Sequence, residues 1–138
     1  HGGARACYIP SLDQINLPEK TSFNTSADYY ATAYHELIHF TGSEKRLARL
    51  KNDSFGSEGY AFEELIAELS SAFLSVLVGI DGETKQNNSA YIKSWAKSIR
   101  EGKNFIFSAM ASAEKAYNYI AEYNKIVENN FEIIKKFG

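Results

Sequence analysis

Two histidines and a glutamate within five consecutive residues are the part of this chain best suited to chemistry. His35 and His39 are four positions apart, and such positions lie one above the other on a helix face. Both imidazoles can therefore direct a ring nitrogen at one zinc ion. Glu36 lies about 100° round the helix from His35, within reach of a water on that ion. This spacing is typical of a zinc hydrolase in which Glu36 is the general base.

A five-residue pattern can also arise by chance, as an exposed helical turn with two unrelated histidines. The flanking residues argue against that interpretation because they are uncharged and mostly bulky, which predicts a buried turn: Tyr34, Leu37, Ile38 and Phe40. Buried polar groups without partners cost several kcal/mol. A metal ion would provide the missing partner.

A catalytic zinc ion has three protein ligands and an open position for water, so a third ligand is needed. His1 begins the chain and Cys7 lies in a predicted hairpin, whereas Glu64 and Glu68 share one face of a predicted helix. We assign Glu64 as the third ligand and Glu68 as the acceptor for the free ring N–H of one histidine. The alternative is a solvated acidic strip. Glu63 is expected to point to the surface.

The ligand set favours zinc, although manganese or iron can bind the same two histidines and one carboxylate. The expected reaction is hydrolysis of a peptide bond, in which Glu36 takes the proton of the attacking water and passes it to the leaving amine. Tyr60 and Tyr91 are candidates for stabilising the oxyanion by residue type only, because packing is the commoner role of tyrosine. An edge strand of the hairpin could hold an extended substrate.

The elements that must position these groups begin with two short strands, residues 4–9 and 14–17, joined by a turn at 10–13. Thr25, with Asp28 three residues later, resembles a capping box and starts a helix that runs to about Phe40. Gly42 is the expected stop. Residues 43–59 are polar and are expected to form mainly loop.

The rest of the chain reads as helix. A second helix is expected over 60–77, and small residues near its acidic face (Ala61, Ala67, Ser71 and Ser75) would let the first helix approach closely. Its apolar stripe consists of Phe62, Leu65, Ile66, Leu69 and Phe73.

After a turn at 81–88, a third helix contains Trp95 and ends at Gly102. A fourth helix begins near Asn104, with an apolar stripe of Ile106, Ala109, Ala113, Ala116 and Ile120. Asn129 and Asn130 are expected to break it. Strands followed by helices predict an α+β fold dominated by helix.

Bulk properties narrow the class of protein. The 138 residues fit one domain, and a formal charge of −2 leaves no basic footprint for nucleic acid. The single cysteine excludes an internal disulfide and favours a reducing compartment. No apolar run reaches membrane-spanning length, so we expect a cytoplasmic protein. Because the chain begins with His1, we expect it to have been excised from a longer protein.

Several motifs in order carry a family resemblance. They occupy residues 1–6, 8–11, 15–18, 29–42, 46–47, 59–65, 68–69, 72–74, 90–92 and 95. An HExxH helix followed by a glutamate on a later helix resembles the gluzincin branch of zincin metallopeptidases. The closer match is to the C-terminal metallopeptidase-like domain of ArdC-type antirestriction proteins. The resemblance covers about residues 1–120; Phe40 replaces a tryptophan typical of the family, and 121–138 match no family pattern.

This resemblance implies a zincin-like fold and a role in protecting incoming mobile DNA from host restriction, in bacterial cytoplasm or in a recipient cell after conjugation. The family's other half is an N-terminal domain that binds single-stranded DNA, so this domain alone is not expected to bind nucleic acid. Two alternatives to a peptidase stay open. The domain could be a binding module that blocks a restriction enzyme, or a metal-dependent hydrolase of a non-peptide substrate.

Overall fold

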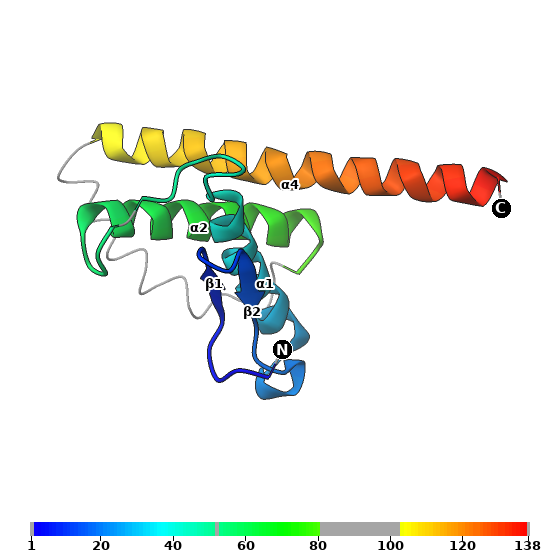
Figure 1. Ribbon diagram of the computed structural model, residues 1–138, viewed down its shortest axis with the longest axis horizontal. Coiled ribbons are helices and arrows are strands. Elements are labelled where there is room, and N and C mark those ends of the chain that lie inside the picture. The colour runs from blue at the N-terminus through cyan, green and yellow to red at the C-terminus, as the bar shows by residue number, and fades with distance from the viewer. Residues whose placement is uncertain (1, 52, 81–102, 138) are drawn as a thin grey trace.

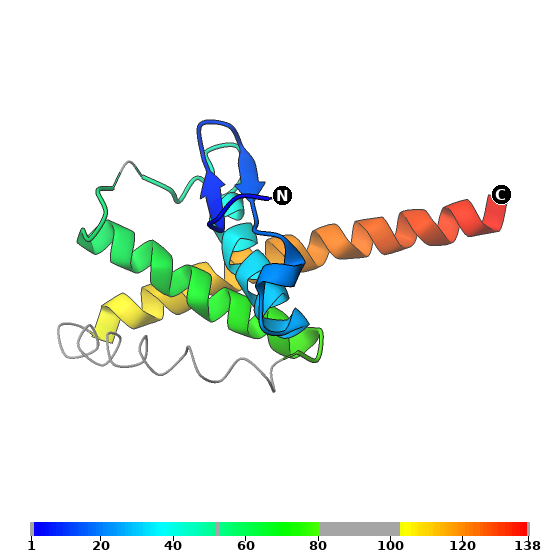
Figure 2. The same ribbon diagram turned by 90° about the horizontal axis from the view of Figure 1, so that it is seen from below.

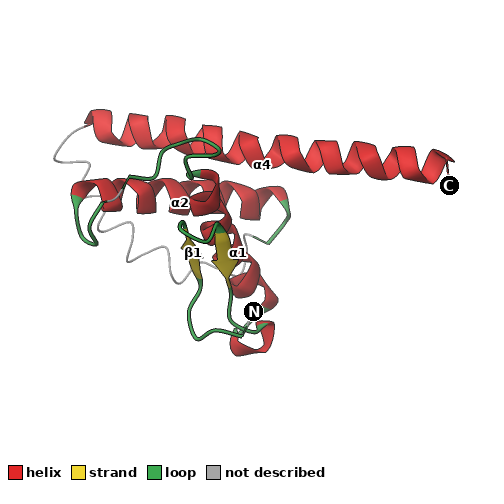
Figure 3. Ribbon diagram, viewed as in Figure 1, coloured by secondary structure: helices red, strands yellow, loops and turns green. Residues whose placement is uncertain are grey.

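The computed structural model describes residues 2–51, 53–80 and 103–137 (Figure 1). Its elements are β1 (Cys7–Ile9), β2 (Gln14–Asn16), the short 3-10 helix η1 (Lys20–Ser22), α1 (Ser26–Thr41), α2 (Glu58–Leu77) and α4 (Lys103–Phe137). The described residues are therefore mostly helical, with a small antiparallel sheet beside α1 (Figure 3), which confirms the predicted fold class. The predicted turn at 81–88 and third helix lie outside the described residues, as do His1 and Tyr91.

The two strands form a hairpin that is shorter than predicted. Tyr8 is opposite Ile15 in the antiparallel register. The turn is closed by two backbone hydrogen bonds of 3.2 Å, from the N–H groups of Leu12 and Asp13 to the carbonyls of Ile9 and Pro10. Asp13 has a φ of 52°, in the left-handed region that aspartate tolerates better than most residues. The hairpin lies against α1, the helix that carries both site histidines (Figure 1).

Helix α1 begins and ends as predicted, although Gly42 is required for a different reason. At the start, the hydroxyl of Thr25 accepts a 3.0 Å hydrogen bond from the Asp28 N–H. At the end, Gly42 has an ordinary right-handed φ of −78°. A Cβ there would lie 2.9 Å from Leu50 Cγ and 3.0 Å from Arg49 Nη2. The glycine is thus needed because the following loop folds back onto the helix end.

Helix α2 lies between α1 and α4, and its core side is slightly rotated from the predicted stripe. Leu65 and Ile66 are buried as expected, but Phe73 is 46% exposed and the buried residue at that end is Leu74. The expectation for Phe73 was wrong because α4 packs on the Leu74 side of α2. Phe73 lies at the margin of the contact between α2 and α4, where the centre of its ring is 6.5 Å from the centre of the Tyr117 ring.

Small side chains let α2 and α4 approach closely. Ala109, Ala113 and Ala116 of α4 are fully buried. The hydroxyl of Ser70 on α2 donates to the carbonyl of Ala113, at 3.1 Å, as well as to its own helix. Figures 1 and 2 show that α2 lies along the N-terminal half of α4 and that the other half extends past it.

The predicted break at Asn129 and Asn130 was wrong, because α4 is continuous to Phe137. Asparagine costs only a fraction of a kcal/mol in a helix, and this segment contains neither proline nor glycine. Although α4 has 35 residues, no helix within the described ranges is long and apolar enough to cross a membrane.

Replacing Ala113 by leucine should destabilise the protein, because the side chain at this position is fully buried against α2. We expect the free energy of unfolding to fall by about 1–3 kcal/mol, the usual cost of adding volume to a packed core. Ala111→Leu is the matched control: Ala111 is exposed on the same helix, so its substitution should change the value by less than about 0.5 kcal/mol. Urea unfolding of both variants measures the difference, and equal effects would contradict this packing.

Candidate metal centre

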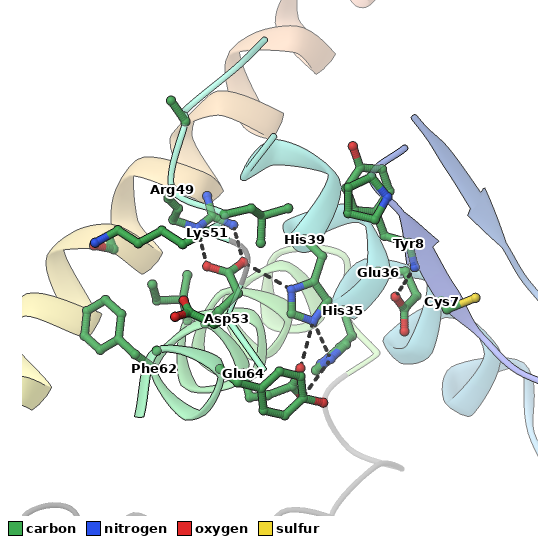
Figure 4. Close-up of a pocket in the computed structure, with 18 of the residues that line it drawn as sticks. Cys7, Tyr8, His35, Glu36, His39, Arg49, Lys51, Asp53, Phe62 and Glu64 are labelled. Atoms are coloured by element: carbon green, nitrogen blue, oxygen red, sulfur yellow. Dashed lines mark hydrogen bonds and ion pairs between the residues drawn. The ribbon is translucent and has the colours of Figure 1, made fainter. Parts of the chain in front are cut away.

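His35 and His39 of α1 and Glu64 of α2 bring three metal-binding side chains to one point (Figure 4). The two Nε2 atoms are 3.1 Å apart. Glu64 lies 3.6 Å from His35 Nε2 through one carboxylate oxygen and 3.4 Å from His39 Nε2 through the other. The structure therefore brings together the three residues that were predicted as ligands.

The spacing of these atoms fits a divalent cation. Tetrahedral zinc, with bonds of about 2.0–2.1 Å, holds its ligand atoms about 3.4 Å apart. Octahedral coordination with similar bond lengths gives about 3 Å. The observed spacings of 3.1 to 3.6 Å suit both geometries, so the donor set accommodates zinc and also metals that prefer six ligands.

The packing of α1 on α2 produces this convergence. Ile38, one residue before His39, is fully buried in the core between the helices. Ala67, Ser71 and Ser75 of α2 are also buried, as the close approach of α1 predicted, whereas Ala61 is exposed. Small side chains along α2 thus allow the histidines of α1 to reach the Glu64 carboxylate.

Each histidine has a second carboxylate at its other ring nitrogen. Glu68 Oε1 lies 3.5 Å from His35 Nδ1, the position expected for an acceptor of the free ring N–H. Burial raises the pKa of the Glu68 carboxyl above its ordinary value, more than the nearby His35 ring lowers it.

Glu63 occupies the equivalent place beside His39, and the expectation that it points to the surface was wrong. Its side chain is only 13% exposed, and its Oε1 lies 3.1 Å from His39 Nδ1. The reason is the loop after α1, which brings Arg49 against Glu63 and covers this side of α2. No local sequence pattern indicated this contact, because Arg49 lies in a stretch that was predicted only as loop.

Glu36, the predicted general base, lies in a cavity of about 630 Å³ together with both histidines and Glu64. Its carboxylate is buried and accepts a 2.8 Å hydrogen bond from the backbone N–H of Tyr8 in β1. Among the described residues, this is the one hydrogen bond to the Glu36 carboxylate. Its second oxygen can therefore accept a proton from a water molecule.

A group of side chains fastens the hairpin over Glu36. The hydroxyl of Tyr8 donates to Asp13 at 2.8 Å, and Arg46 donates to both Asp13 and Ser43. The Arg46 guanidinium also lies 3.3 Å from the centre of the Phe40 ring, an arrangement that adds cation–π attraction. These contacts tie β1 to the end of α1 and thereby hold the Tyr8 N–H on Glu36.

The remaining predicted residues have different outcomes. Tyr60 lines the cavity and packs its ring on Phe55, with centroids 4.9 Å apart. Tyr91 lies outside the described residues, so its predicted role is not tested by the structure. Cys7 is a free thiol that also lines the cavity.

The carboxylates around the site favour positive charge there, either a proton on His39 or a metal ion in its place. Burial of the His39 ring works against its protonation, but its hydrogen bonds to Glu63 and Glu64 outweigh burial and raise the pKa of His39 to about 9. Burial likewise favours the neutral form of Glu64, but hydrogen bonds to His35 and His39 outweigh it and hold the Glu64 pKa well below its ordinary value. An ionised carboxylate beside two imidazoles is the state that binds a metal ion.

Comparison with known proteins places this geometry in a family. A model of the zincin-like metallopeptidases matches residues 1–112. The chain belongs to this family. The zincin-like domain also resembles the Mn(II)-bound crystal structure of the antirestriction protein ArdC from plasmid R388, with a TM-score of 0.74 and 39% identity. That match covers 86% of this chain and 44% of ArdC; the metal-free ArdC structure gives a TM-score of 0.70.

Two further relatives are much longer than this chain and have other names. The domain is 45% identical over 123 residues to a DNA primase TraC of Escherichia coli, which covers 89% of this chain and 8% of TraC. It is 33% identical over 130 residues to an uncharacterized protein of Sinorhizobium fredii, covering 94% of this chain and 42% of that protein. The zincin-like domain therefore spans less than half the length of each of these relatives.

Metal binding to the zincin-like domain should depend on pH, because His39 must lose its proton to coordinate a cation. With a pKa of about 9 in the metal-free protein, His39 is mainly protonated at neutral pH. Apparent affinity for Mn²⁺ should therefore rise from about pH 6 to about pH 9, by up to about tenfold per unit, and then level off. Titration calorimetry in buffers of different ionisation enthalpy should count about one released proton. Affinity that is constant over this range would contradict the assignment.

The Arg46 contacts should hold the hairpin over the site. In Arg46→Met, the loop after α1 loses the hydrogen bond that Arg46 donates to Asp13 of the hairpin, together with the one to Ser43. The Tyr8 amide should then exchange with solvent at least about tenfold faster, as expected for losing charged hydrogen bonds. Lys45→Met is the control, because the Lys45 ammonium is 76% exposed and 3.5 Å from Asp13, so its loss should have little effect. Amide exchange measured by NMR distinguishes the two, and equal protection in both variants would refute the role of Arg46.

Proposed function

We propose that this zincin-like domain hydrolyses peptide bonds, with His35, His39 and Glu64 as ligands of a divalent cation and Glu36 as general base. One observation carries the proposal: three donor groups from two helices converge at 3.1 to 3.6 Å, and Glu36 lines the same cavity. The preferred ion is zinc, and the Mn(II) found in the related ArdC structure makes manganese the alternative. The bound cation would act as a Lewis acid and lower the pKa of a water.

Glu36 is well suited to move the proton in this reaction. The Tyr8 N–H holds one carboxylate oxygen of Glu36, which lines the cavity, and no hydrogen bond from a described residue engages the other oxygen. That oxygen would accept the proton of the attacking water and later deliver it to the leaving amine. Tyr60 lines the same cavity and is the candidate donor to the developing oxyanion.

The cavity has the size of a small-ligand or peptide site, since such pockets usually enclose about 300–1,000 Å³. Residues 5–8, along and before β1, line one side of it. Because the Tyr8 N–H points to Glu36, this edge of β1 faces α1 and the cavity rather than β2. An extended peptide could pair with the backbone of residues 5–7 on this side of the cavity, next to the Tyr8 N–H that Glu36 occupies, with its scissile bond near Glu36.

Glu36→Gln should separate metal binding from hydrolysis. The glutamine carbonyl can still accept from the Tyr8 N–H, so fold and metal content should be retained, but the side chain cannot accept a proton. We expect cleavage of denatured casein to fall by at least about 10²-fold. Glu44→Gln, which changes an exposed carboxylate beyond α1, is the matched control and should keep full activity.

Parallel measurements test the assigned metal ligands and the class of substrate. His39→Ala and Glu64→Ala should lose bound metal by elemental analysis, and chelator should abolish cleavage in the wild type. Single-stranded DNA, incubated in parallel, tests the alternative of a non-peptide substrate. Casein cleavage that survives in Glu36→Gln, or metal content that survives in both ligand variants, would refute the proposal.

A second candidate function is a metal-stabilised binding module that blocks a restriction enzyme. The names of the relatives favour it, since they describe antirestriction and priming rather than proteolysis. In that case the full-length protein would protect mobile DNA in the cytoplasm of the donor or recipient cell equally well with Glu36→Gln. Loss of protection in that variant would instead link the biological role to hydrolysis.

A further inference from the structure

At the second ring nitrogen of His39 lies a carboxylate, that of Glu63, which is held by an arginine. The carboxylate beside His35, that of Glu68, has no such arginine among the described residues. Glu63 accepts two hydrogen bonds of 2.9 Å from Arg49, one from Nε and one from Nη2. Its Oε1 also lies 3.1 Å from His39 Nδ1. The side chains of Glu63 and Arg49 are only 13% and 12% exposed, so water competes little for these bonds.

Arg49 is itself attached to the end of the helix that carries His39. Its Nη2 donates to the carbonyl of Ile38 at 2.6 Å and its Nη1 to the hydroxyl of Thr41 at 3.0 Å. Its backbone N–H donates to the carbonyl of Gly42 at 2.9 Å. The chain of contacts therefore starts on α1, crosses to α2 through Glu63 and returns to α1 at the His39 ring.

The ion pair between Arg49 and Glu63 gives two neighbouring glutamates, Glu63 and Glu64, different roles although their side chains are identical. Glu64 has both oxygens directed at the Nε2 atoms, where a cation would bind. Glu63 has both oxygens engaged by Arg49, and bidentate pairing with a guanidinium leaves it an acceptor for an N–H rather than a ligand. At His35, the corresponding Glu68 lies farther away, at 3.5 Å, and no arginine among the described residues contacts it.

We propose that Glu63 and Arg49 are positioning residues for the metal centre: Arg49 orients Glu63, and Glu63 accepts the Nδ1–H of His39 so that Nε2 is presented to the cation. The geometry requires this arrangement of the ring, because the Nε2 atom of His39 faces His35 Nε2 and Glu64 while Nδ1 faces Glu63. The inference rests on the metal site proposed above. It assigns a function to the one acidic residue of this group that was expected at the surface.

Metal affinity provides the first test. Glu63→Ala should weaken binding of Zn²⁺ and Mn²⁺ by about 10–100-fold, the usual effect of losing an outer hydrogen-bond partner of a ligating histidine. Arg49→Met should weaken it in the same direction, because Glu63 loses both of its donors. Glu58→Gln is the matched control, since Glu58 is an exposed acidic residue in the first turn of the same helix, and its affinity should equal that of the wild type.

The second test reports on the ring itself. In the Zn²⁺-loaded wild-type protein, the Nδ1–H of His39 should give a slowly exchanging imidazole resonance in ¹H–¹⁵N NMR. Glu63→Gln keeps a carbonyl acceptor, so the resonance should persist at a shifted position, whereas Glu63→Ala should lose it to exchange with water. General destabilisation of the fold would not produce this ordered difference, and Glu63→Gln provides the readout should the alanine variant fail to fold.

The outcomes separate this inference from the proposed function. Wild-type protein that binds neither Zn²⁺ nor Mn²⁺ would overturn the metal centre and this inference together. Wild-type binding with unchanged affinity in Glu63→Ala, or an unchanged His39 resonance in Glu63→Gln, would overturn the role of Glu63 alone. Glu63-dependent affinity accompanied by the shifted resonance would support it.

Discussion

The close approach of α1 and α2 forces two imidazoles and several carboxylates into one half-buried site, and the rest of the structure is arranged around that constraint. Glu63, Glu64 and Glu68 all lie within 3.6 Å of a histidine nitrogen. Carboxylates brought together away from water repel one another and need positive charge nearby. Arg49 provides it for Glu63, and a divalent cation would provide it for Glu64.

Packing on the far side of α2 supports this arrangement. The alanines of α4 are fully buried against α2, and Ser70 adds a hydrogen bond between the two helices. Helix α2 is therefore held from both sides, by α1 across the site and by α4 behind it. A helix fixed in this way keeps its carboxylates at a constant distance from the histidines, which is a requirement for a preorganised metal site.

Contacts from outside the helices complete the site. The hairpin places a backbone N–H on Glu36, and the loop after α1 places Arg49 on Glu63. Both segments are fastened by an arginine: Arg46 links the loop to Asp13 of the hairpin, and Arg49 links the loop to the end of α1. Short irregular segments thus orient the side chains that the two helices bring together.

Local sequence determined the features that depend on spacing along one helix. The HExxH pattern placed His35 and His39 on one face of α1, and the four-residue spacing of Glu64 and Glu68 placed them on one face of α2. The backbone hydrogen bonds of a helix fix which residues share a face. The capping of α1 and the close packing at Ala67, Ser71 and Ser75 of α2 were predicted in the same way, although Ala61 is exposed.

Only the tertiary structure decided which carboxylate meets which nitrogen. Glu63 was expected at the surface because nothing within a few residues of it indicates a partner, and Arg49 reaches it from 14 positions away. The contact between Tyr8 and Glu36 spans 28 positions. Such contacts depend on how the loop and the hairpin fold back over the helices, and the energy that selects those paths comes from packing and charge pairing across the whole site rather than from any local pattern.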